Sequence, residues 1–207
     1  MSPAASNSKA CLMTRTKQKS QSVSERTGTD ISDQRVRRTR ERIDAAFVEL
    51  LHKRPYGRIH VSDITRKAHV GRPTFYAHYS GKDALLRSQF ERIVAPMLSV
   101  GEDGAIDATA LFRHVSAASQ FYRTLMGADA GSAPRLLRQC FAERASMLMR
   151  SRGSERLEER VAAPFVASVL ITIVESWLDG GAKEPPSELQ SVFQKLTNAN
   201  ATAANRP

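Results

Sequence analysis

Apolar residues recur at helical spacing along most of this chain, and no stretch shows the strict alternation that predicts a strand. The first strong stripe lies within 33–53, where a possible capping residue, Asp33, comes before the apolar positions and Pro55 follows them. Its apolar members are Ile43, Phe47, Leu50 and Leu51. The pattern predicts an all-α protein with about nine helices.

The later helices are bounded by glycines and prolines. Pro96 is expected to kink or end one helix, and Pro164 is expected to divide another. Gly180-Gly181 predicts a helix end, and the run from Ser187 to Gln190 has a capping-box pattern that predicts the last helix start. The segments concerned are 62–68, 73–79, 82–98, 107–127, 133–152, 155–179 and 187–197.

Residues 59–86 are typical of a helix-turn-helix, in which the second helix enters a DNA major groove. The turn would be His69-Val70-Gly71, and His tolerates the left-handed backbone conformation better than most residues. Pro73 suits the first turn of the second helix because its missing N–H has no partner there. Phe75 would face inward, which leaves polar side chains around it to reach bases and phosphates.

The positive charge of the chain is concentrated in one part of it. The net charge is +10, and residues 34–100 hold fourteen Lys or Arg against six Asp or Glu, whereas residues 101–207 hold twelve of each. This asymmetry favours a DNA-binding domain beside a neutral one. Five arginines lie between 35 and 42, Arg37 and Arg38 among them, where they oppose the helix dipole and suggest a nearby phosphate backbone.

These patterns predict four regions. Residues 1–33 are expected to form a disordered basic arm, 34–82 the helix-turn-helix domain, 83–197 a helical ligand-binding and dimerisation domain, and 198–207 a tail. The arm is either a solvated tail or a source of phosphate contacts.

Other features narrow the class of protein. Cys11 and Cys140 do not form a disulfide framework, and the N-terminus lacks a signal-peptide pattern, so a cytoplasmic location is expected. The apolar run Val161–Leu178 contains Pro164 and is interpreted as a buried helix, not a membrane span. The sequence has no GxSxG, no phosphate loop and no HExxH, so neither an enzyme nor a cofactor or metal is predicted.

The spacing FYxHYxxKDxLL and its surroundings resemble the N-terminal domain of the TetR/AcrR family of transcriptional regulators over about residues 36–98. The segment from Leu170 to Phe193 resembles the C-terminal domain of the subgroup that includes the coactivator of dihydroxyacetone kinase genes. The resemblance implies a homodimer that binds a palindromic DNA operator.

The resemblance also implies roles for individual residues. Arg72 and Thr74 match positions that reach bases or nearby phosphates, and Tyr76 and His78 match phosphate contacts. Ala77 stands where relatives carry a long polar side chain. Because the alanine side chain is short, one base contact is expected to be absent. Lys82 matches a phosphate clamp at a helix N-terminus. The predicted DNA-binding set is Arg72, Pro73, Thr74, Tyr76, Ala77, His78, Lys82, Arg37 and Arg38.

In the family, the last two long helices of each subunit form the dimer. Here those helices offer apolar residues that would serve either that interface or the subunit's own core: Val166, Leu170, Ile173, Trp177, Leu189, Val192 and Phe193. Two functions remain open. One is a repressor released by a small-molecule effector, and the other is a DNA-bound coactivator whose C-terminal domain holds a partner protein.

Overall fold

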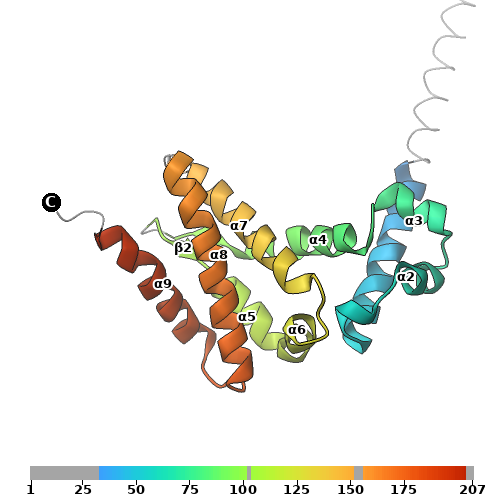
Figure 1. Ribbon diagram of the computed structural model, residues 1–207. Coiled ribbons are helices and arrows are strands. Elements are labelled where there is room, and N and C mark those ends of the chain that lie inside the picture. The colour runs from blue at the N-terminus through green and yellow to red at the C-terminus, as the bar shows by residue number, and fades with distance from the viewer. Residues whose placement is uncertain (1–32, 102–103, 152–155, 204–207) are drawn as a thin grey trace, which may run out of the picture. The chain divides into compact units, whose positions relative to one another are not determined.

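The computed structural model describes residues 33–101, 104–151 and 156–203, and it is built almost entirely of helices (Figure 1). The chain divides into two compact units, Met1–Ile43 and Asp44–Pro207. The described part of the first unit is helical, and its Arg37 Nε lies 3.7 Å from Glu41 Oε1. The same helix continues through residue 53, as the sequence predicts. The predicted basic arm and the last residues of the predicted tail lie outside the described residues.

The second unit begins with the elements expected of a helix-turn-helix. A short 3-10 turn, η1 (Tyr56–Arg58), precedes α2 (Val61–Ala68), α3 (Arg72–His78) and α4 (Lys82–Ile93). The predicted boundaries of α2 and α3 are met to within a residue. The helix predicted over 82–98 is shorter than expected: α4 ends at Ile93, and Pro96 lies in the 3-10 turn η2 (Ala95–Met97) that follows it.

The rest of the second unit is a helical bundle. It comprises α5 (Thr109–Ala117), α6 (Ser119–Met126), α7 (Ala133–Ser151), α8 (Arg156–Asp179) and α9 (Pro186–Ala203). In this bundle α7 packs on α8 and α4, and α9 packs on α5 and α8. Phe112 of α5 and Phe193 of α9 are fully buried, with ring centroids 6.4 Å apart. The predicted all-α class is confirmed.

The sequence predicted no strands, and this prediction is wrong in one detail. Two short strands, β1 (Ser99–Val100) and β2 (Ile106–Asp107), form an antiparallel pair. Strands of two residues are too short to produce a visible alternation of apolar and polar positions. The connection is closed by a hydrogen bond in which the Gly101 N–H donates to Ala105 O, and Gly104 has a φ of 77°.

Two predicted helix boundaries are also corrected. The segment 107–127 is two helices, because Ala118 leaves the helical region with φ −122° and ψ 31°. No Gly or Pro marks that break in the sequence. Conversely, Pro164 lies inside α8 without dividing it. Pro164 has no N–H to donate to the Arg160 carbonyl. Because both residues are exposed, water can donate to that carbonyl instead.

The predicted capping-box role of Gln190 is replaced by a long-range contact. Gln190 is buried, and its Oε1 accepts a hydrogen bond of 3.0 Å from the backbone N–H of Ala108. This bond fastens α9 to the start of α5. The start of α9 is close to its predicted position, and the helix extends to Ala203.

The most apolar helix has an exposed face. By length and composition the part of α8 from Glu159 to Asp179 could cross a membrane, but half of it is buried inside the protein, as in a core helix. Val161 is 65% exposed and Phe165 is 39% exposed. Within a single chain this helix, interpreted from the sequence as buried, therefore keeps an exposed side.

Candidate nucleic-acid interface

The turn between α2 and α3 depends on a left-handed residue. His69 has φ 53° and ψ 48°, the conformation that the sequence predicted His would tolerate at this turn. The backbone N–H of Val70 donates to Thr65 O over 3.0 Å and closes the end of α2. At the other end of α2, Asp63 accepts a hydrogen bond from the His60 backbone N–H. That bond holds the pKa of Asp63 below its ordinary value.

The second helix, α3, presents a polar face above one buried aromatic ring. Phe75 is fully buried and Tyr79, which follows the helix, is 5% exposed. Tyr76 is 54% exposed, and His78 is half-buried. Arg72, Pro73, Thr74 and Ala77 are exposed. The structure thus groups all six predicted α3 residues on one short helix.

The polar ends of Arg72, Thr74, Tyr76 and His78 have no polar partner in the part of the chain that the structure describes. None of these side chains makes a hydrogen bond or an ion pair with any residue that the structure describes. An arginine offers five donors, a hydroxyl one, and a histidine at least one. A face of unpartnered donors on an exposed helix matches the hydrogen-bonding demands of phosphates and base edges.

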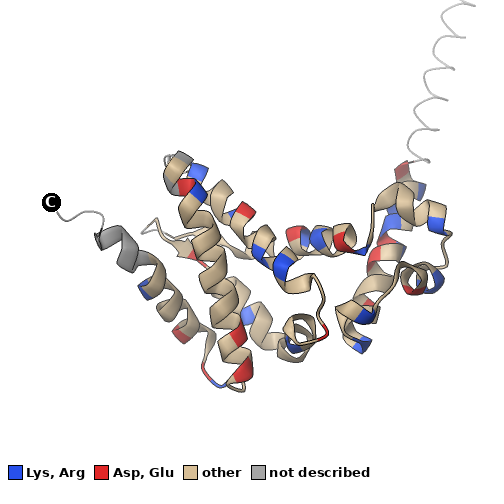
Figure 2. Cartoon of the chain, viewed as in Figure 1, with Lys and Arg blue, Asp and Glu red and all other residues tan. Residues whose placement is uncertain are grey.

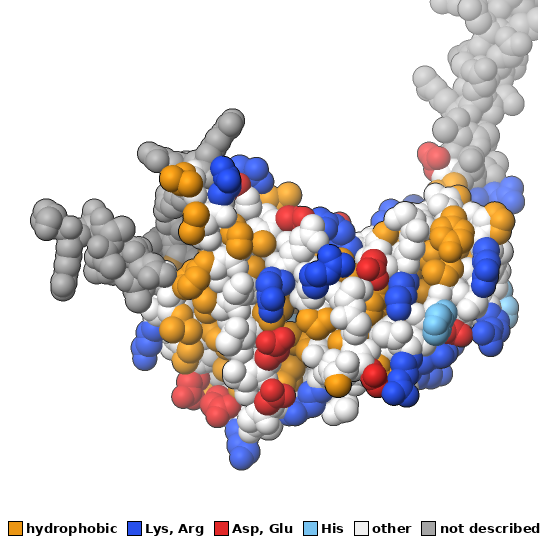
Figure 3. All heavy atoms as spheres, viewed as in Figure 1, with side chains coloured by type: hydrophobic (Ala, Val, Ile, Leu, Met, Phe, Trp, Pro, Cys, Tyr) orange, Lys and Arg blue, Asp and Glu red, His pale blue; other side chains and the backbone are white. Residues whose placement is uncertain are grey.

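Cations accompany this face. Figure 2 shows Lys and Arg on both α2 and α3, and Figure 3 shows basic side chains gathered over the same part of the surface. Lys67 of α2 lies 2.6 Å from Glu49 Oε1 and so ties α2 to the preceding helix. Hydrogen bonds from Lys53 and then Lys67 lower the pKa of Glu49 to about 2. Arg37 and Arg38 are exposed on the described part of the first unit.

Lys82 is more constrained than a free phosphate clamp. Its Nζ donates to Tyr56 O over 3.1 Å and to Ile59 O over 2.9 Å, and it lies 4.4 Å from the centroid of the Tyr56 ring. Partial burial lowers its pKa. Because an ammonium group has three donors, these two bonds leave one for a phosphate. The residue joins the start of α4 to the segment before α2.

A buried polar network supports the back of α3. Tyr79 donates its hydroxyl proton to Asp44 Oδ1 over 2.7 Å, and Asp44 is 6% exposed. Arg92 of α4 reaches Asp44 Oδ2 at 3.2 Å and also donates to Gln89 Oε1 at 2.6 Å. The end of the recognition helix is therefore linked through four side chains to α4.

Sequence reasoning did not identify this network. Two signals were present: Asp44 directly follows Ile43 on an apolar face, and a buried tyrosine hydroxyl needs a partner. A second contact was also missed, in which Tyr56 and Ser132 both donate to Asp83. Burial and then the bond to Asp83 raise the pKa of Tyr56.

The predicted dimer residues occupy two environments. Val192 is 40% exposed, whereas the other six lie in the subunit's own core. Trp177 is 4% exposed, and its Nε1 donates to Glu184 O over 3.1 Å. The exposed apolar residues of the same two helices include Val192 and four residues outside the predicted set. We call these residues the α8–α9 apolar face: Leu157, Val161, Phe165, Val192 and Leu196.

Metal-binding residues do not gather anywhere in the described ranges. No group of three or more His, Cys, Asp or Glu is placed to hold a metal ion there. Cys140 is a buried free thiol, and burial raises its pKa to about 11. Cys11 lies outside the described residues.

A short helix with an exposed polar face and a buried aromatic residue, which follows another helix after a turn in the left-handed conformation, is typical of the helix-turn-helix class. Residues 43–88 match the family of bacterial regulatory proteins named tetR. Over these residues the chain is similar to the DNA-binding domain of TetR-type regulators.

Individual relatives agree with this assignment. The chain is 31% identical over 170 residues to an uncharacterised helix-turn-helix transcriptional regulator, YxbF, of Bacillus subtilis (strain 168). That match covers 78% of this chain and 45% of the relative, so the chain spans less than half the length of that protein.

Two solved structures share the fold. The dihydroxyacetone kinase operon activator DhaS matches with a TM-score of 0.50 and 21% identity, covering 80% of this chain and 97% of its own. A TetR transcriptional regulator from Streptococcus agalactiae 2603V matches with a TM-score of 0.51 and 21% identity, covering 81% and 97%. At this identity the similarity concerns the fold alone.

Proposed function

We propose that the chain is a sequence-specific DNA-binding regulator of transcription that acts as a homodimer, and that it is a repressor released by a small-molecule effector. Its partners are then a palindromic operator, a second copy of itself and the effector, and it works in the cytoplasm without a cofactor. The observation that carries this proposal is the exposed face of α3, on which Arg72, Thr74, Tyr76 and His78 have no partner among the described residues.

The reading of DNA follows from the types of side chain on that face. A guanidinium group can donate two parallel hydrogen bonds to the O6 and N7 atoms of guanine, which distinguishes bases. Thr74 can contact either a base edge or a phosphate, whereas Tyr76 and His78 suit phosphate oxygens. Tyr76 can also pack against a thymine methyl group. Arg37, Arg38 and the remaining donor of Lys82 would add phosphate contacts.

The α8–α9 apolar face supports the homodimer. Leu157, Val161 and Phe165 recur every four residues along α8, and Val192 and Leu196 are exposed on α9, which packs on α8. Figure 3 shows hydrophobic side chains along this part of the surface. A second copy would cover the face by the same residues through a two-fold axis. Two recognition helices would then be available for the two halves of one operator.

The alternative is a coactivator whose C-terminal domain binds another protein. The same α8–α9 apolar face favours it to the extent that a different chain could cover those residues. A solution measurement separates the two functions. A purified protein that is a dimer on its own supports the repressor. A purified protein that stays monomeric leaves the α8–α9 apolar face free for a different chain and supports the coactivator.

Selection from a random duplex library tests the proposed DNA recognition. The recovered sequences are expected to share a palindrome whose half-sites lie about one helical turn apart, or a multiple of it, because a two-fold dimer presents two equivalent helices. A matched selection with Phe75→Ala, which removes the buried anchor of α3, should recover no motif. Recovery of single, unpaired half-sites by the wild-type protein would contradict the dimer, and recovery of random sequence would contradict specific recognition.

A further inference from the structure

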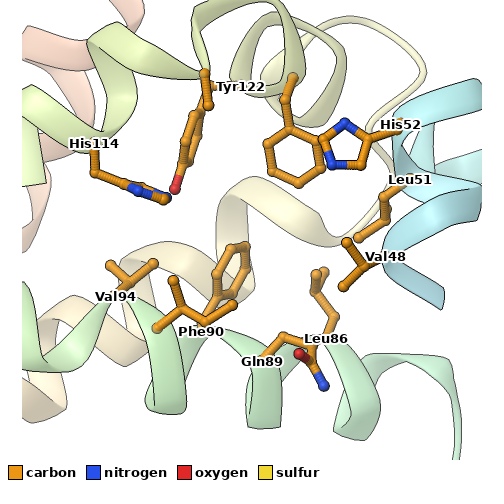
Figure 4. A pocket seen from close by; sticks show the side chains of 12 residues that line it. Val48, Leu51, His52, Leu86, Gln89, Phe90, Val94, His114 and Tyr122 are labelled. Atoms are coloured by element: carbon orange, nitrogen blue, oxygen red, sulfur yellow. The ribbon is translucent and has the colours of Figure 1, made fainter. Parts of the chain in front are cut away.

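A cavity of about 210 Å³ lies where the helical residues 44–53 meet α4, α5 and α6. Figure 4 shows His52, His114 and Tyr122 across the open space from Leu86 and Phe90 of α4 and from Val94, which follows α4. Val48 and Leu51 also line it, and both belong to the helix that precedes the helix-turn-helix. The cavity is therefore shared between the DNA-binding elements and the helical bundle.

The lining indicates the chemistry of an occupant. Phe121 adds a further ring, with its centroid 4.9 Å from that of His52 and 5.4 Å from that of Tyr122. No Lys, Arg, Asp or Glu lines the cavity. Burial of an unpaired ion in such surroundings is strongly unfavourable, so a charged ligand does not fit. A cavity of roughly 150 Å³ in an apolar core can hold benzene, so this volume suits a substituted single ring.

One polar group of the lining needs a partner. Gln89 is 4% exposed, its Oε1 accepts from Arg92, and its Nε2 has no hydrogen-bond partner among the described residues. A buried donor without an acceptor is uncommon in folded proteins. A ligand that carries a carbonyl or ether oxygen would supply that acceptor.

The same glutamine connects the cavity to the recognition helix. From Gln89 the contacts continue through Arg92 and Asp44 to Tyr79, which follows α3 directly. A ligand held by Gln89 and packed against Val48 and Leu51 would act on one end of this network directly, and also on the helix that carries Asp44. Such a ligand would have different affinities for two arrangements of α3, which is the requirement for coupling two sites.

We infer that this cavity is an effector site for a small neutral aromatic molecule with one hydrogen-bond acceptor, and that its occupancy changes DNA affinity through the Gln89–Arg92–Asp44–Tyr79 network. The inference rests on the proposed function for its regulatory half. The binding half stands on the cavity alone and is measured without DNA.

The test uses acetophenone, a single ring with one carbonyl, in calorimetric titrations of the full chain. We expect saturable binding of one molecule per chain. Ethylbenzene, which lacks the acceptor, should bind more weakly, and benzoate, which is charged, should not bind. Ala118→Leu fills the cavity and should weaken acetophenone by about tenfold or more, since each 1.4 kcal/mol is a factor of ten. The adjacent and exposed Ala117→Leu is the matched control and should leave affinity unchanged.

Gln89→Glu tests the hydrogen bond separately. The carboxylate keeps an acceptor for Arg92 but removes the Nε2 donor that has no partner among the described residues. It should weaken acetophenone more than ethylbenzene, whereas a general disturbance of the cavity would weaken both equally.

The regulatory half is read from DNA affinity with and without acetophenone. Saturating acetophenone should change the affinity of the wild-type protein for its selected operator by about fivefold or more, a typical coupling between sites. The Ala118→Leu protein should bind the operator with the affinity of the wild-type protein, and acetophenone should not change that affinity.

The outcomes remain distinguishable. The cavity site is overturned if acetophenone does not bind, or if Ala117→Leu and Ala118→Leu weaken its binding equally. In that case, DNA binding by the ligand-free protein still supports the proposed function. Acetophenone binding with unchanged DNA affinity overturns the regulatory half. Failure of the ligand-free protein to select any DNA motif overturns the proposed function and leaves the measured ligand site standing.

Discussion

Replacement of Asp44 by Ala is expected to destabilise the protein by about 2–4 kcal/mol, because the change leaves the buried Tyr79 hydroxyl without an acceptor and Arg92 without its carboxylate. Loss of one partner of a fully buried ion pair costs roughly 3–5 kcal/mol, but the Arg92 side chain is 58% exposed, which reduces that cost. For a chain of this length the melting temperature should fall by roughly 4–16 °C.

Two variants sharpen this prediction. Asp44→Asn keeps an oxygen for the Tyr79 hydroxyl and removes only the charge, so its effect should be clearly smaller than that of Asp44→Ala. Asp179→Asn, at an exposed position, is the control for the loss of a negative charge. Chemical denaturation measures all three. Equal stability of Asp44→Ala and the wild-type protein would show that the network contributes nothing to the fold.

Arginine placed at two positions of α8 should separate the fold from the dimer. Trp177→Arg removes a buried ring and its bond to Glu184 O and inserts an unpaired charge. We expect a loss of more than about 5 kcal/mol, comparable with the whole stability of a typical domain, and therefore an unfolded protein. Phe165→Arg lies on the exposed α8–α9 apolar face and should leave the subunit folded while converting the dimer into a monomer.

Circular dichroism and sedimentation distinguish these results. The two variants share the same type of substitution on one helix and differ in burial, 4% for Trp177 against 39% for Phe165. A folded monomer from Phe165→Arg should also bind a palindrome much less tightly than the dimer does, because it offers one recognition helix at a time. A Phe165→Arg protein that remains dimeric would place the interface elsewhere.

The helical framework and the recognition helix were accessible from the sequence because each depends on local signals. The stripe of Ile43, Phe47 and Leu50 predicted the first helix, and His69 was already identified as a residue able to take the left-handed conformation. The exposed face of α3 follows from the position of one inward residue, Phe75, on a helix of known period.

What the sequence left out depends on contacts between distant residues. Gln190 looks like part of a local cap, yet it bonds Ala108, and no short-range pattern indicates that pairing. Lys82 was predicted to meet phosphate, but two carbonyls lie within reach of its Nζ once the chain is folded. The apolar residues of α8 and α9 could serve a core or an interface, and only their burial separates Trp177 from Phe165.

The same limit applies to the cavity. Its lining comes from the first helix, α4, α5 and α6, and no local sequence pattern brings residues of these four helices together. The unpartnered Nε2 of Gln89 exists only because Arg92 occupies the other end of the amide. The spacing of apolar residues in the sequence gives neither the volume of the cavity nor the missing partner of the Gln89 amide.

The central claim, that α3 reads bases through Arg72, is tested most directly by operator and scrambled DNA affinities of Arg72→Ala at one fixed salt concentration. We expect a loss of about 1–3 kcal/mol in discrimination between the two duplexes, because the guanidinium contact to a base edge is removed. Arg138→Ala, which removes an exposed charge on α7, should lower neither the discrimination nor the operator affinity by a comparable amount. An equal loss of affinity for operator and scrambled DNA in Arg72→Ala would contradict the claim and reduce Arg72 to a phosphate contact.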